Sequence, residues 1–152
     1  MTKSEKLVIL VAEDDQDDFE MIEEVFIENK ILNPIFHVND GAELMCYLRR
    51  EEPFQDKHEY PRPGIILLDL NMPKLDGREA LSLIKTDESL RRIPVVVFSS
   101  SELPDDIIGS YNLGANSFIK KPINMMDFIK IIRAFSDYWL QVVRIPTNGG
   151  TT

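Results

Sequence analysis

Several residues with chemically reactive side chains stand at the end of short apolar runs. They are Glu13, Asp14 and Asp15, then Asp69, then Ser99, and finally Lys121. Carboxylates held close together repel one another and stay ionised most easily with a cation between them. An all-oxygen set is typical of Mg²⁺, which binds through one or two carboxylates plus a phosphate. A carboxylate with a hard cation, a lysine and a hydroxyl beside it could accept a phosphoryl group.

Asp69 is the candidate acceptor, because of the stretch that precedes it. The apolar run Ile65–Leu68 lies between Pro63-Gly64 and Pro73, which is typical of a fully buried parallel strand. Asp69 then stands at the carboxyl end of that strand, where open α/β sheets bind ligands. On this stretch alone, an aspartate that merely begins a turn is an equal alternative.

The elements that would position these residues alternate along the chain. Apolar runs predict strands at residues 7–12, 35–38, 65–69, 95–98 and 117–120. Helical spacing and turn residues predict five helices, over about 16–30, after Asp40, after Gly77, from Pro104, and for about 20 residues after Asn124. This alternation indicates βαβ units in an α/β, doubly wound fold, with a five-stranded parallel sheet of order 2-1-3-4-5. Residues 1–146 form one domain, and 147–152 are expected to be a disordered tail.

Composition excludes several classes of protein. The net charge of −9 and pI near 4.7 argue against nucleic acid as a partner, because the basic pairs Arg49-Arg50, Arg91-Arg92 and Lys120-Lys121 are isolated from one another. The single cysteine, Cys46, allows no disulfide within the chain and favours a cytoplasmic location. No apolar run approaches the roughly 18 residues that a membrane span needs.

The acidic run Glu13–Glu28 has a simpler interpretation for most of its members. The stretch contains nine acids and no base, and those from Asp17 and Asp18 onward are expected to form a solvated helix face. A calcium-binding EF-hand loop starting at Asp14 is excluded, because Phe19 would occupy its glycine position and Val25 its glutamate position.

Two kinds of catalytic site are not expected. The chain has no GxxxxGK[ST] phosphate-binding loop. Neither His37 nor His58 is expected near the polar strand ends, so a histidine-based hydrolase is not predicted.

The pattern resembles the receiver domain of two-component response regulators. The matching segments are Val11–Asp15, Leu68–Pro73, Asp76-Gly77, Pro94–Ser99 and Phe118–Pro122. They occur in the family's order and span most of the chain. The resemblance implies a flavodoxin-like (βα)5 fold and a role in phosphorelay signalling.

The resemblance also implies a phosphorylation site and a metal site. Asp69 would accept a phosphoryl group from a phosphohistidine on a sensor histidine kinase or a phosphotransfer protein. Glu13, Asp14 and Asp69, with the backbone carbonyl of Asn71, would hold Mg²⁺. The protein would not be an enzyme beyond its own Mg²⁺-dependent phosphorylation and dephosphorylation.

Three further roles follow from the same resemblance. Ser99 would donate a hydrogen bond to a phosphoryl oxygen, and Lys121 would pair with the phosphate. Phe118 would turn inward as an aromatic switch, although it lacks the hydroxyl of the tyrosine common at this position. A cis peptide bond is expected before Pro122.

A narrower resemblance is to the stand-alone regulators paired with bacterial and cyanobacterial phytochromes. It is carried by the loop Glu51–Pro63, the run Ser99–Ser101 and the end Tyr138–Pro146. It implies a phytochrome-type kinase as partner and no attached output domain.

The last predicted helix is longer than a sheet layer needs. Its apolar stripe steps by three and four from Phe128 past the expected core to Val142. Large exposed apolar patches mark interfaces. We therefore expect a homodimer face, whose candidates are Phe135, Tyr138, Trp139, Val142 and Val143.

Two other functions compete with a signalling switch. An aspartate-nucleophile phosphatase would need a second acid two residues after Asp69, where Asn71 stands. A degenerate receiver acting only as a binding module would not need the complete set of Asp14, Asp69, Ser99 and Lys121.

Overall fold

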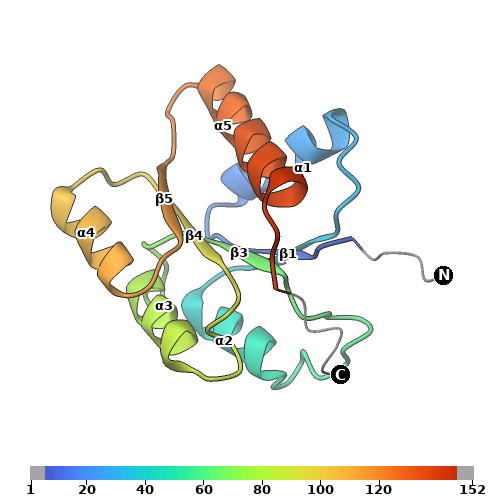
Figure 1. Ribbon diagram of the computed structural model, residues 1–152, viewed down its shortest axis with the longest axis vertical. Coiled ribbons are helices and arrows are strands. Elements are labelled where there is room, and N and C mark those ends of the chain that lie inside the picture. The colour runs from blue at the N-terminus through green and yellow to red at the C-terminus, as the bar shows by residue number, and fades with distance from the viewer. Residues whose placement is uncertain (1–5, 147–152) are drawn as a thin grey trace.

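A five-stranded parallel sheet forms the centre of the computed structural model, which describes residues 6–146 (Figure 1). The strands are β1 (Ile9–Ala12), β2 (Ile35–Val38), β3 (Ile65–Leu68), β4 (Val95–Ser99) and β5 (Ser117–Lys120). Their order is β2-β1-β3-β4-β5, and every neighbouring pair is parallel. The predicted fold class and strand order are therefore confirmed.

A loop leads from each of the five strands into a helix. The helices are α1 (Gln16–Glu28), α2 (Gly41–Arg49), α3 (Gly77–Thr86), α4 (Pro104–Asn112) and α5 (Met125–Asp137). Side-chain oxygens of Asp15, Asp40, Asp76 and Asn124 accept hydrogen bonds from backbone N–H groups in the first turns of α1, α2, α3 and α5. Such caps satisfy donors that a helix start leaves free. The caps determine where each helix begins, and thereby the length of the loops at the carboxyl edge of the sheet.

The sheet is covered on both faces (Figure 1). Helices α1 and α5 lie on one face, where Phe19, Ile22 and Ile132 pack against β1, β3 and β4. Helices α2 and α3 lie on the other, and α4 lies beside the edge strand β5. Each fully buried aliphatic side chain contributes roughly 1.5–3 kcal/mol. The three central strands are buried along their whole length, which explains their continuous apolar sequences.

The last helix changes its winding where the core ends. After the α5 segment, residues Tyr138–Val142 (η1) form a π-helix, so the predicted single α-helix of about 20 residues is 13 residues of α-helix followed by five of π-helix. Trp139 and Leu140 still pack against the core on the α1 face, whereas Tyr138 is 55% exposed and Val142 68% exposed.

Phe135 does not belong to the predicted dimer face. It is only 4% exposed and packs with Phe128 and Ile132 against the sheet. The same i, i+3/i+4 spacing that extended the stripe places Phe135 on the sheet side of α5. Its inclusion among the dimer candidates is therefore wrong.

A cis peptide bond was expected before Pro122, but this bond is trans. The cis bond found within residues 6–146 joins Glu52 and Pro53. The trans preference of an X–Pro bond is only about 0.5–1 kcal/mol, so a sequence motif alone does not fix the isomer. The predicted tail, residues 147–152, lies outside the described residues.

Candidate functional site

Three carboxylates meet at the carboxyl edge of the sheet. Glu13 follows β1 and is 1% exposed, and Asp69 follows β3 and is 6% exposed. Asp14 beside them is exposed. One oxygen from each of the three lies within 4.8 Å of the others. We call Glu13, Asp14 and Asp69 the acidic site. The structure thus brings together the predicted carboxylate ligands.

Lys121 supplies the positive charge of the site. Its Nζ lies 2.8 Å from Glu13 Oε1, 2.9 Å from Asp18 Oδ2 and 3.5 Å from Asp69 Oδ2. It also lies 5.8 Å from the centre of the Phe98 ring. The side chain is 10% exposed, so solvent screens these contacts little. One ammonium group is therefore shared among three acids.

Burial and charge shift the pKa values of these groups in linked ways. Burial, together with the charge of Asp69, raises the pKa of Glu13 to about 8, against the opposing effect of Lys121. Burial also raises the pKa of Asp69, again opposed by Lys121. Burial lowers the pKa of Lys121, but its hydrogen bonds with Glu13 and Asp18 and the charge of Asp69 outweigh this and raise it above the usual value. The site thus carries more negative charge than one lysine neutralises.

The donor set suits a hard divalent cation. All of the acidic-site ligands are carboxylate oxygens, which Mg²⁺ and Mn²⁺ prefer. Burial raises the pKa values of both Glu13 and Asp69, and a neighbouring carboxylate adds to each shift, Asp69 at Glu13 and Asp14 at Asp69; a cation would relieve this repulsion. The residues present therefore fit a divalent metal ion. Asn71, predicted to contribute its backbone carbonyl, follows Asp69 by two positions, and its backbone N–H donates to Asp69 Oδ1 at 3.3 Å.

Asp18 is a site residue that the sequence analysis assigned to a solvated face. It belongs to the first turn of α1, directly after the β1 strand end, and it faces Lys121. The spacing carried a signal, because Asp18 precedes the buried Ile22 by four positions. Residues four apart share a helix face, so this spacing was compatible with an inward-pointing Asp18, although Glu23 has a similar spacing from Phe19 and Phe26.

His37 also lies closer to the site than expected. Its Nε2 is 2.7 Å from the carbonyl oxygen of Glu13, and its ring stacks on Phe19 at 3.9 Å between centroids. The expectation that no histidine lies near the strand ends is therefore wrong for His37. The cause is register: β2 pairs with β1 so that His37 stands beside Val11, two residues before Glu13.

Ser99 lies at the end of β4, fully buried, as predicted. Its Oγ accepts a hydrogen bond from the backbone N–H of Ser101 at 3.2 Å. The Ser99 carbonyl accepts a hydrogen bond from the Lys121 backbone N–H at 2.7 Å. This bond extends the β4–β5 pairing and holds the Lys121 main chain next to Ser99.

A chain of polar contacts continues from Ser101 away from the site. The Ser101 hydroxyl donates to Asp106 in α4 at 2.5 Å, and Asp106 pairs with Arg78 of α3 at 2.8 Å. The loop after β4 is thereby tied to two helices. Phe118, the predicted switch, is half-buried on β5, and its backbone N–H donates to the Tyr111 hydroxyl at 3.2 Å.

The comparison with protein families matches residues 9–133 to the response regulator receiver domain. The chain belongs to this family. It is 39% identical over 139 residues to the response regulator Rcp1 of a Synechocystis species. These residues make up 91% of this chain and 92% of the relative. The receiver fold and its role in two-component signalling are therefore those recognised from the sequence.

Two solved receiver structures are especially similar. The Mn²⁺-bound form of response regulator Rcp1 has a TM-score of 0.87 at 38% identity, over 93% of this chain and 99% of that one. The phosphorylated cyanobacterial phytochrome response regulator RcpA has a TM-score of 0.88 at 39% identity, and the match covers 94% of this chain and 100% of that one. Among the described residues of this receiver domain, no helix is long and apolar enough to cross a membrane.

Proposed function

We propose that this receiver domain is a signalling switch whose Asp69 accepts a phosphoryl group from a phosphohistidine. The observation that carries the proposal is the position of Lys121, whose ammonium group lies between the buried carboxylates of Glu13 and Asp69. The same ammonium group could pair with phosphoryl oxygens on Asp69. Opposed charges pre-arranged at a buried position are what phosphoryl transfer needs from a protein.

In the transfer step, a carboxylate oxygen of Asp69 attacks the phosphorus atom of the phosphohistidine. The new O–P bond forms as the P–N bond breaks, and the electron pair goes to the imidazole nitrogen, which takes up a proton. The attack requires ionised Asp69, and Lys121 favours that form. Glu13, Asp14 and Asp69 would hold Mg²⁺ with the Asn71 carbonyl; when bound, it would neutralise charge on the carboxylates and the phosphoryl oxygens.

After transfer, two neighbouring groups respond to the phosphate. Lys121 exchanges part of its pairing with Glu13 and Asp18 for phosphoryl oxygens. The Ser99 hydroxyl, which accepts from the Ser101 N–H, still has its own proton to donate to one of them. Movement of Ser99 would let Phe118 turn inward and alter the surface around α4 and β5.

The partner is inferred to be a phytochrome-type sensor histidine kinase. The support is the similarity over nearly the full chain to a structure described as a cyanobacterial phytochrome response regulator. The net charge of −9 and the acidic site argue against nucleic acid as a partner.

A phosphoryl-donor experiment tests the proposal. Incubation of the full chain with acetyl phosphate and Mg²⁺ should give a base-labile adduct, measured by mass spectrometry. Asp69→Asn should abolish the adduct, whereas Asp17→Asn, which removes an exposed acid in the first turn of α1, should not. An unmodified wild type would contradict the proposal and favour a binding module; rapid turnover of many phosphoesters would favour a phosphatase.

We further propose that the end of the last helix forms a homodimer face, without Phe135. Tyr138 and Trp139 pack edge to face at 5.5 Å, and Val142 beyond them is 68% exposed, with Val143 following. Sedimentation velocity should show a dimer that Val142→Glu dissociates. Ile27→Glu, at a similarly exposed apolar position on α1, should leave the dimer intact. A monomeric wild type with and without a phosphoryl mimic would contradict this face.

A further inference from the structure

Basic residues that are scattered in the sequence come together at the amino edge of the sheet. Arg50, Lys57 and Arg62 line one cavity of about 360 Å³. Arg50 follows α2, and Arg62 stands three residues before β3. We call this the basic cavity. It lies at the opposite edge of the sheet from Asp69, which follows the carboxyl end of β3.

Both guanidinium groups of the basic cavity are held in place by backbone carbonyls. Arg50 Nη1 donates to the Tyr60 carbonyl at 3.1 Å, and Arg62 Nη2 donates to the Ser89 carbonyl at 2.7 Å. Each guanidinium has five N–H donors in a fixed fork. These contacts fix the position of each group and leave most of its donors for a ligand.

The cations of the basic cavity have no carboxylate in contact. Within residues 6–146, the ion pairs shorter than 4.0 Å involve other basic residues, and none of Arg50, Lys57 and Arg62 takes part in one. What sets these three residues apart is that they line one cavity together. The cluster is therefore available to an external anion.

The electrostatics at Arg62 support the same conclusion. Burial lowers the pKa of Arg62, and the charges of Arg92 and Arg50 lower it further, while Asp87 opposes them. Two basic pairs that are isolated in the sequence, Arg49-Arg50 and Arg91-Arg92, thus each supply a residue that repels Arg62. A bound anion would relieve this repulsion.

The remaining walls of the cavity are largely apolar. They are formed by Tyr47, Leu48, Pro63 and Leu90. The Tyr47 hydroxyl already donates to the Pro61 carbonyl at 2.8 Å, so its proton is not free for a ligand. The volume is in the lower part of the roughly 300–1,000 Å³ range of small-molecule sites.

We propose that the basic cavity binds a small phosphate ester. The phosphate lies against Arg50, Lys57 and Arg62, because guanidinium forks match phosphate oxygens in pairs. The organic body of the ester packs on Leu48, which is half-buried in the cavity wall. This site is independent of phosphorylation at Asp69.

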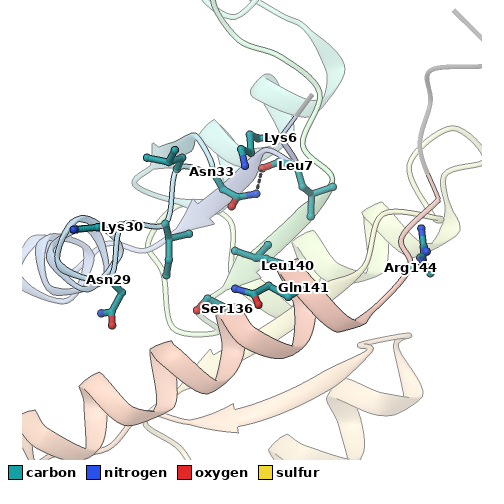
Figure 2. Close-up of a pocket in the computed structure, with 11 residues that line it drawn as sticks. Lys6, Leu7, Asn29, Lys30, Asn33, Ser136, Leu140, Gln141 and Arg144 are labelled. Carbon is teal, nitrogen blue, oxygen red and sulfur yellow. Dashed lines mark hydrogen bonds between the residues drawn. The ribbon is translucent and has the colours of Figure 1, made fainter. Parts of the chain in front are cut away.

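A second cavity, of about 650 Å³, shares no lining residue with the basic cavity (Figure 2). It is also lined by cations, including Lys30 and Arg144. Figure 2 shows these two at opposite ends of the cavity, with the Lys30 ammonium directed away from Gln141. Its charges do not converge, so it supplies the matched control position rather than a second site.

The experiment is an NMR titration of the ¹⁵N-labelled full chain with phenyl phosphate and with inorganic phosphate, in EDTA. Phenyl phosphate should shift amide signals within residues 47–63 and 87–92 and bind more tightly than inorganic phosphate. Arg62→Gln should weaken binding about tenfold, as expected for a lost charged hydrogen bond. Lys57→Gln, an exposed loop change, should also weaken binding, and Lys30→Gln, with the same charge change, should not.

Vesicles of phosphatidic acid and phosphatidylcholine distinguish a lipid headgroup from a free ester. If the wild type floats with the phosphatidic acid vesicles and Arg62→Gln does not, the site is supported and its ligand is a lipid headgroup. Absence of flotation with saturable phenyl phosphate binding would support a free ester. Shifts confined to the neighbourhood of Asp69, or unchanged binding by both Arg62→Gln and Lys57→Gln, would overturn the proposal.

Discussion

The two edges of the sheet have opposite electrostatic problems. At the carboxyl edge, Lys121 is shared among three carboxylates, and burial together with the charge of Asp69 raises the pKa of Glu13. At the amino edge, Arg50, Lys57 and Arg62 share a cavity with no carboxylate in contact among the described residues. Both arrangements raise the free energy of the unliganded fold. Unbalanced charge, of either sign, is therefore where we expect this fold to bind a ligand of the opposite sign.

The largest expected effect comes from removing Lys121, the cation that pairs with the buried carboxylates of the acidic site. Lys121→Ala leaves buried Glu13 and Asp69 without their shared partner, which should lower the free energy of unfolding by about 3 kcal/mol in EDTA. Lys120→Ala is the matched control, because its pair with Glu102 is solvent-exposed and should contribute less than about 1 kcal/mol. Urea unfolding measures both. Equal losses would show that burial does not distinguish the two lysines.

An intermediate effect is expected from pH at the same edge. With the Glu13 pKa raised from 4.5 to about 8, the folded state binds one more proton than the unfolded state between these values. The stability that Glu13 contributes is fully present below pH 4.5 and is lost as the pH rises through about 8, by at most about 1.4 kcal/mol per pH unit. Asp69 changes in the same direction.

Urea unfolding in EDTA across this pH range measures the slope. Glu13→Gln should flatten it, because glutamine does not titrate. Added Mg²⁺ should also flatten it in the wild type, because a divalent cation stabilises the ionised carboxylates. A Glu13→Gln variant with the wild-type slope would place the titrating group elsewhere.

The smallest effect is expected at the amino edge. Arg92→Gln removes one of the charges that lower the pKa of Arg62, so without phosphate it should stabilise the fold by at most about 0.5 kcal/mol at low salt. High salt should remove this gain by screening. Arg91→Gln, its exposed neighbour, should change stability less. A destabilising Arg92→Gln would indicate that attraction, not repulsion, dominates at this edge.

The positions of the predicted site residues could be read from the sequence because of how parallel sheets are built. Apolar runs mark each strand, and the residue after each run must lie at the carboxyl edge. Glu13, Asp69, Ser99 and Lys121 therefore converge whatever the details of packing. The cap residues Asp40 and Asn124 set the helix starts by local hydrogen bonds, so the fold class also followed from short-range signals.

The tertiary structure decided contacts between residues distant in sequence. Asp18 pairs with Lys121 across 103 positions, and His37 reaches Glu13 through strand register. Packing depth likewise placed Phe135 in the core. The basic cavity arises in the same way, since Arg50 and Arg62 meet only when the long loop folds back before β3. Sequence spacing specifies directions along one element, whereas these contacts depend on how separate elements are stacked.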